Sequence, residues 1–347
     1  MSRKRVIGLS VIAACVLLVG CNLSLIGYGI SQGYGEAKII WKARPVEEVM
    51  KDPNFNDTLR KKLILIQEVK RYAIDSLNEM NSRNFTTVYD QRGKPVMWVV
   101  TACLPFSFTP KQWHFPFVGT VSYKGFFEKK KAEKEREKLI KEGYDTDLGT
   151  ASAWSTLGWF RDPVLSNILY GSEGAIAELI IHELTHATLY VKDSTEYNEN
   201  LASFIGEKGA MRFLKYKFGD PSEELTDYID ALKDERGYSA YVLSGMKRLD
   251  TLYKAFKPET PVSIKKQRKD SLIRKWAQDI NLIAFADTQH YRRRVRRATL
   301  NNAYFMSFSR YEEKQHDFEK IYYSQCQGDL KQFLALMKKL HPIKSNL

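Results

Sequence analysis

The feature that most constrains the fold is a five-residue motif, His182-Glu183-Leu184-Thr185-His186, set among apolar residues. Those apolar residues recur at helical spacing, which predicts an α-helix that begins near Ser172. Residues at positions i and i+4 share one face of a helix, so the rings of His182 and His186 can reach one cation. Glu183 is turned aside from that pair and can reach a water molecule held beside the cation. The motif therefore predicts a helix that carries a metal site with an open position.

A third ligand must come from elsewhere, because a catalytic zinc ion is held by three protein ligands and keeps a fourth position open. Glu199 follows Asn198 on the next predicted helix, and Gly206 would allow this helix to approach the first one closely. Glu207, eight residues beyond Glu199, is the competing candidate. We expect Glu199 to bind the metal, which leaves Glu207 to support the ligands or to bind a substrate amine.

The N-terminal segment has the pattern of an export signal. The basic run Arg3–Arg5 precedes an apolar stretch over residues 6–19, which is short for a membrane-spanning helix. The stretch ends in Leu18-Val19-Gly20-Cys21, which resembles a bacterial lipobox. Lipid on Cys21 would hold the chain at a membrane without spanning it, and an uncleaved N-terminal anchor is the alternative. Asn22 in place of aspartate favours the outer membrane, with the protein facing the periplasm.

These signals predict three parts of the chain. Residues 1–20 form the signal peptide, residues 21–44 the lipid anchor and a flexible glycine-containing tether that enters a helix, and residues 45–347 one domain. Cys103 and Cys326 are the two cysteines of the body, and the exported compartment permits a disulfide between them. Two buried free thiols are the alternative.

The middle of the chain is predicted to supply a small sheet before the metal helix. Strands are expected over residues 96–102, 118–123 and 147–159, with a charged surface helix over residues 127–142. A helix is expected to start at Asp162-Pro163. Part of the last strand is predicted to pair with the backbone of a substrate, against the alternative of an ordinary core strand. The residues of this proposed substrate strand are Gly149, Thr150, Ala151, Ser152 and Ala153.

The C-terminal third is predicted to be helical, with a helix over residues 221–252 broken near Gly237 and one long or two stacked helices over residues 263–303. The second of these contains the basic run Arg292–Arg297, and the formal net charge of the chain is +13. A solvated helix face is the first interpretation of this run, and contact with a membrane surface is the second. The export signal excludes nucleic acid as a partner.

Together these segments resemble the predicted aminopeptidase family of bacterial lipoproteins, within the gluzincin type of zinc metallopeptidases. The resemblance covers nearly the whole chain after Cys21. It rests on the lipobox, the metal motif with Asn198-Glu199, and the segments Arg44–Val49, Phe117–Phe127, Ser155–Ser166 and Asn301–Ala303. It implies an α+β, mostly helical, zincin-like fold with a small sheet before the active-site helix, and one Zn²⁺ ion.

The resemblance also implies roles for the residues of the motif. His182, His186 and Glu199 bind zinc, and Glu183 is the general base that takes a proton from the attacking water. A further donor should stabilise the oxyanion that forms. The candidates for that catalytic role are Tyr304 and Tyr311, followed by His290 and His316.

The resulting hypothesis is a membrane-anchored zinc peptidase, an aminopeptidase, that acts as a monomer on peptides in the cell envelope. One alternative is a zinc endopeptidase that cleaves envelope proteins. The other is a lipid-anchored binding or assembly protein with a structural zinc ion, although Glu183 would have no use in a purely structural site.

Overall fold

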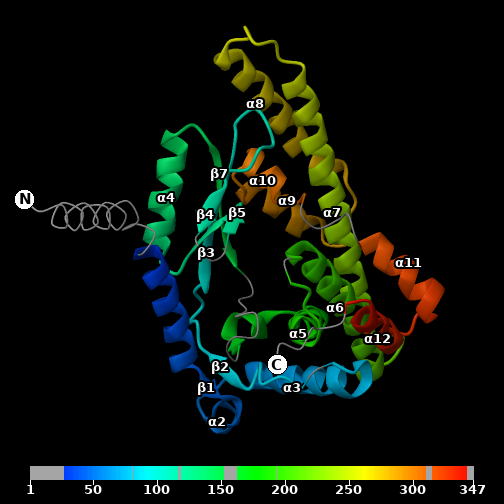
Figure 1. The fold of residues 1–347 in the computed structure, drawn as a ribbon. Coiled ribbons are helices and arrows are strands. Elements are labelled where there is room, and N and C mark those ends of the chain that lie inside the picture. Colours follow the sequence, from blue (N-terminus) through cyan, green and yellow to red (C-terminus); the bar gives the residue numbers. More distant parts are fainter. Residues whose placement is uncertain are drawn as a thin grey trace, which may run out of the picture.

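The computed structural model describes residues 27–79, 81–115, 119–151, 162–192, 194–309 and 315–341. These residues are mostly helical with small sheets, which confirms the α+β prediction (Figure 1). The helices are α2 (Val46–Lys51), α3 (Asp57–Leu77), α4 (Lys129–Lys141), α5 (Glu173–Thr188), α6 (Thr195–Phe218), α7 (Glu223–Lys254), α8 (Val262–Asp279), α9 (Thr288–Arg297), α10 (Asn302–Met306), α11 (Gln315–Cys326) and α12 (Leu330–Leu340). The strands are β1 (Arg44–Pro45), β2 (Thr87–Tyr89), β3 (Met97–Cys103), β4 (Trp113–Phe115), β5 (Gly119–Val121), β6 (Lys124–Phe126), β7 (Asp145–Ala151) and β8 (Val164–Leu165).

The larger of two main cores surrounds α5 and α6. Helix α3 supplies one wall of it: Asn56 caps its first turn by accepting hydrogen bonds from Thr58 and Leu59, and its buried residues recur every three or four positions. Helices α11 and α12 pack on α6 and complete the same core, and α12 also contacts α3. The two helices that carry the predicted metal motif are thus held on several sides by apolar contacts.

The second core lies between α7, α8, α9 and α10 and centres on Trp276 and Phe305, both fully buried. Helix α7 contributes to both cores and joins them (Figure 1). The predicted break in α7 near Gly237 is wrong, because the helix is continuous from Glu223 to Lys254. A single glycine disfavours a helix by only about 1 kcal/mol, and tertiary packing along α7 outweighs that.

A three-stranded antiparallel sheet, in the order β6–β3–β7, packs against α4 and α10. The predictions of β3 and of the charged helix α4 are confirmed. Strand β7 has β3 as its one partner among the described residues, so it is an edge strand, with Gly149 opposite Val99. Gly149, Thr150 and Ala151 of the proposed substrate strand lie on it, whereas Ser152 and Ala153 lie outside the described residues.

The structure corrects two further predictions. Asp162-Pro163 does not start a helix: β8 follows and pairs in parallel with β2, and a short 3-10 helix, Ser166–Tyr170, comes next. Residues 27–42 are helical throughout rather than beginning as a flexible tether. The reason is tertiary packing: the Tyr28 hydroxyl donates a hydrogen bond to the Gly125 carbonyl at 2.9 Å, and Gly35 lies directly against the ring of Phe127.

Cys103 and Cys326 are both buried and both free, so the alternative of two free thiols is the correct one. They belong to different clusters of buried side chains. Cys103 donates a hydrogen bond to the Ser107 carbonyl, and burial raises the pKa of its thiol to about 12. In α9, Tyr291 and Val295 are buried in the second core, whereas Arg293, Arg296 and Arg297 are exposed, which agrees with the solvated face expected for the basic run.

The described helices include none with the length and apolar character needed to cross a bilayer. Residues 1–20 and Cys21, the predicted signal peptide and lipidation site, lie outside the described residues.

Candidate metal centre

Helix α5 starts where the sequence predicts, at a cap formed by Ser172, whose hydroxyl accepts a hydrogen bond from the Ala175 amide. Its apolar face, which includes Ile176, Ile180 and Leu184, is fully buried in the larger core. His186 lies in the last turn of α5, where the carbonyl end of the helix dipole favours a positive charge. The cap and the buried face therefore fix the position of α5, and its two histidines point toward α6.

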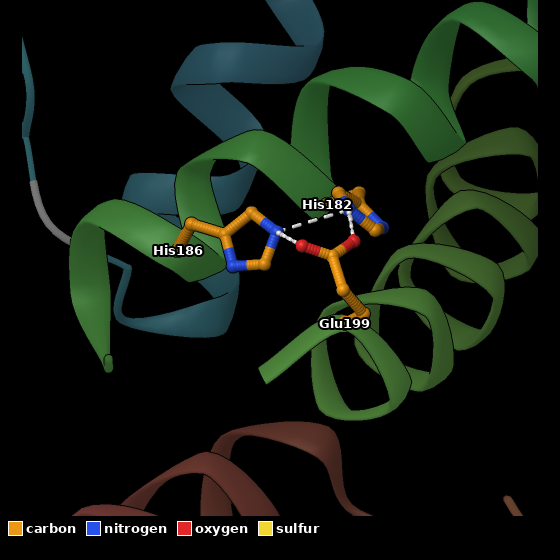
Figure 2. Close-up of side chains that lie close together, drawn as sticks. All are labelled: His182, His186 and Glu199. Carbon is orange, nitrogen blue, oxygen red and sulfur yellow. Dashed lines mark hydrogen bonds and ion pairs between the residues drawn. The ribbon is translucent and has the colours of Figure 1, made fainter. Parts of the chain in front are cut away.

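The side chains of His182, His186 and Glu199 converge on one point between α5 and α6 (Figure 2). The two Nε2 atoms are 3.1 Å apart. The Glu199 carboxylate lies between the rings, with Oε2 at 3.5 Å from Nε2 of His182 and Oε1 at 3.4 Å from Nε2 of His186. Among the described residues, this is the one group of three or more His, Cys, Asp or Glu side chains close enough to share a metal ion.

The spacing of these atoms fits a zinc ion. Nitrogen and oxygen ligands lie about 2.0–2.2 Å from zinc, so neighbouring ligand atoms around a tetrahedral ion are about 3.3–3.6 Å apart. The observed separations of 3.1, 3.4 and 3.5 Å are close to that range. Two imidazoles and one carboxylate also form a donor set that zinc accepts in sites with an open position.

Two residues of α6, Asn198 and Gly206, help to bring the Glu199 carboxylate to the two histidines. Asn198 is buried, and its side chain bonds both the amide and the carbonyl of Val191, which fixes the turn between α5 and α6. Gly206 then permits the close approach of the helices: a Cβ atom there would lie 2.9 Å from the Glu178 carbonyl oxygen and 3.2 Å from Cβ of His182. The predicted reason for a glycine at this position is confirmed.

His182 and Glu199 each favour the charged form of the other. Burial opposes the charged form of His182, but its bond to Glu199 and the neighbouring carboxylates outweigh burial and raise the pKa of the imidazole. Hydrogen bonds from the two histidines hold the pKa of Glu199 well below its usual range. Burial raises the pKa of Glu183, although both imidazoles act in the opposite direction. The site thus combines an ionised ligand with a neighbouring carboxyl group that more readily holds a proton.

Glu207 lies outside the three-residue cluster. It is buried and forms an ion pair with Arg236 of α7. Beside it, Glu178 accepts a hydrogen bond from the Tyr228 hydroxyl at 2.9 Å, and the charges of Glu178 and His182 influence each other. We therefore assign Glu207 to the shell of charged groups behind His182. The sequence motif carries no signal for Tyr228 or Arg236, which reach this shell from a separate helix.

A buried acid also lies behind the motif. Glu79 accepts a hydrogen bond from the Thr185 hydroxyl, and burial raises its pKa to about 8. Its second oxygen and Nδ1 of His186 are both buried, and neither has a hydrogen-bond partner within the described part of the chain. A histidine that binds a metal through Nε2 carries its proton on Nδ1 and needs a hydrogen-bond acceptor there.

Two of the predicted oxyanion donors, Tyr304 and His290, are not brought to the cluster. The Tyr304 hydroxyl is bonded to that of Tyr238 in the second core, and His290 is exposed on α9. Tyr311 and the side chain of His316 lie outside the described residues. Tyr190 is 39% exposed, and its ring centre is 6.4 Å from that of His186. It is therefore a candidate donor that sequence reasoning missed, and its position four residues after His186 is the signal that could have found it.

The chain as a whole matches a known protein family. A family model described as "Putative aminopeptidase" matches residues 27–346. The chain belongs to this family. Membership indicates a peptidase, and the match covers nearly all of the described structure, including both helices of the metal cluster. No curated protein and no solved structure matches the chain.

Proposed function

We propose that the chain is a zinc-dependent aminopeptidase held at a membrane. The observation that carries this proposal is the convergence of His182, His186 and Glu199, with Glu183 on the same helix turn. One Zn²⁺ ion held by these ligands would lower the pKa of a bound water and polarise a peptide carbonyl.

Proton transfer and stabilisation of the oxyanion are assigned to side chains of the protein. Glu183 accepts the proton of the attacking water and later gives it to the amine that leaves. Its raised pKa suits this exchange, because a carboxyl group that titrates closer to neutrality returns a proton more readily. Tyr190 is the proposed hydrogen-bond donor to the carbonyl oxygen as that oxygen gains negative charge.

A cavity over one face of the sheet, between β3, β7 and α10, supports action at an amino terminus. Its volume is about 520 Å³, and its walls include Asp147, Gly149 and Thr150 of the sheet together with Tyr304 of α10. An extended peptide that paired with the edge of β7 opposite β3 would run beside this cavity, as in other cases of strand addition. Asp147 would then attract the positive α-amine of the first residue.

Helix α7 contacts the surroundings of both the cavity and the proposed metal centre. Arg236 of α7 contacts Glu207 behind His182, whereas its neighbour Glu235 is paired with Arg294 in the cavity wall. Residues of one turn of α7 thus contact the surroundings of both regions. We propose that a substrate spans them, with its first residue in the cavity and its first peptide bond near the cluster.

The location belongs to the same proposal. Lipid on Cys21 would hold the protein at the outer membrane, facing the periplasm, where peptides are its substrates and no nucleic acid is encountered. We propose that it acts there as a monomer.

The test is hydrolysis of a peptide library by the purified full chain, before and after removal of metal by a chelator, beside Glu183→Gln. Both treatments should abolish turnover, and Glu183→Gln should still bind zinc. Peptides with a free amino terminus should be cleaved and their N-acetylated counterparts should not. Cleavage of both kinds would favour the endopeptidase. Stoichiometric zinc binding with turnover unchanged by chelator and by Glu183→Gln would refute the catalytic proposal.

A further inference from the structure

The helix over residues 27–42 has one face against the protein and one face in solvent. On the inner face, Ile39 is buried and the Tyr28 ring stacks on Phe115 at 5.3 Å. On the outer face, Ile30 is 68% exposed, Tyr34 is 70% exposed and Trp41 is 90% exposed.

These three exposed side chains form one stripe. At about 100° per residue, positions 30, 34 and 41 lie within roughly 40° of one another around the helix axis. Lys38 and Lys42 are exposed beside the stripe. An amphipathic helix with tryptophan, tyrosine and isoleucine on one side and lysines at its border is typical of a helix that lies in a membrane interface.

The place of this helix in the chain points to a bilayer as its partner. Five residues, and so six Cα–Cα steps, separate Cys21 from Gly27, the first described residue. Fully extended, they span about 20 Å, so a lipid on Cys21 would keep the helix next to the bilayer. This step rests on the membrane attachment in the proposed function.

The neighbouring surface carries further positive charge. Helix α4 lies on the same side of the molecule as residues 27–42 (Figure 1), and Lys131 contacts the Ser31 hydroxyl at 3.3 Å. Lys130 and Lys134 of α4 are exposed as well. Three lysines of α4, however, form ion pairs with nearby glutamates, which lowers the net positive charge of this surface. The apolar stripe is therefore the main feature, and the lysines lie at its edge. Lysines near anionic lipid headgroups add attraction to the apolar contact.

We propose that the outer face of residues 27–42 is a membrane-docking surface, with Ile30, Tyr34 and Trp41 in the headgroup region and Lys38 and Lys42 against lipid phosphates. Docking in this way fixes which side of the domain faces the bilayer, beyond what a lipid tether alone would do.

The experiment uses the full chain reconstituted in vesicles of phosphatidylcholine and phosphatidylglycerol, with and without bromine on the acyl chains. Bromine quenches tryptophan only on contact, so the difference between the parent and Trp41→Phe isolates Trp41. A matched control carries Tyr216→Trp in the Trp41→Phe background. Tyr216 is 75% exposed on α6, where its ring lies beside that of Tyr72 of α3 and not on the helix over residues 27–42. Flotation of the same vesicles reports attachment separately.

We expect brominated lipid to remove roughly half of the Trp41 signal and none of the signal that Tyr216→Trp adds to the control variant. Protein that floats with the vesicles while Trp41 stays unquenched would overturn the docking surface and leave the attachment intact. Protein that does not float would overturn both. Burial of Trp41 in a dimer that forms equally without lipid would also overturn the proposal, since the stripe would then be a contact between two copies.

Discussion

The close approach of α5 and α6 can be tested by one added methyl group, in Gly206→Ala. Two effects oppose each other at this position. Alanine favours a helix over glycine by about 0.8–1.0 kcal/mol. The new Cβ, however, would lie 2.9 Å from a backbone oxygen of Glu178 and 3.2 Å from Cβ of His182, both closer than ordinary contact.

Forcing an extra carbon into such a packed contact destabilises a protein by about 1–3 kcal/mol, so the clash should win by up to about 2 kcal/mol. Because the atoms that must move belong to α5, the helices separate at His182 and the distance between His182 and Glu199 grows. Metal sites tolerate shifts of only about 0.2 Å in their ligand distances, so zinc affinity should fall by about tenfold or more.

The assay compares the urea unfolding midpoint of the metal-free protein with its zinc affinity in a competitive titration. Gly237→Ala is the matched control, since a Cβ there would meet only Phe285, at an ordinary 3.7 Å. The control should be stabilised by about 0.8–1.0 kcal/mol and should bind zinc like the parent. If Gly206→Ala is stabilised as much as the control and keeps its zinc affinity, the close helix approach does not position the ligands.

Three further predictions concern single side chains. Tyr190→Phe should lower kcat by about tenfold or more without changing zinc affinity, since it removes only a hydrogen-bond donor, and an unchanged kcat would exclude Tyr190 from the reaction. Asp147→Asn should raise KM about tenfold for peptides with a free amino terminus, because it removes the charge that attracts the α-amine. The exposed control Asp75→Asn should leave KM unchanged, and an equal rise in both variants would exclude Asp147 as the amine partner. Glu79→Gln should stabilise the protein at pH 8 and have little effect near pH 5. Folding raises the pKa of Glu79 from 4.5 to about 8. Between these two pH values the unfolded chain releases the proton and the folded protein keeps it, so the free energy of unfolding of the parent falls by roughly 4 kcal/mol as the pH rises. Urea unfolding of parent and variant at both pH values measures the difference, and a constant difference would refute the shift.

The sequence predicted helices α5 and α6 well because the signals there are local. The cap at Ser172, the helical spacing of the apolar residues and the separation of His182 and His186 all act within a few turns. Glu199 needed one longer inference, from the pair Asn198-Glu199 on the next helix, and the structure brings it to the histidines.

The predictions that failed depend on contacts between distant segments. Helix α7 stays unbroken at Gly237 because it is packed between two cores, which the residues around Gly237 do not reveal. Strand β8 forms because Val164 meets Val88 of β2, at a distance along the chain that a local pattern cannot span. Tyr228 reaches Glu178 from 50 residues away, so the shell behind His182 had no sequence signal.

The most direct test of the metal centre is a zinc titration of the full chain beside Glu199→Gln and Glu207→Gln. The parent should bind one zinc ion. Glu199→Gln should lose affinity severely, because it replaces a charged ligand, whereas Glu207→Gln should lose far less, because Glu207 is paired with Arg236 outside the cluster. Equal affinity of the parent and Glu199→Gln, or a larger loss in Glu207→Gln, would contradict the site described here.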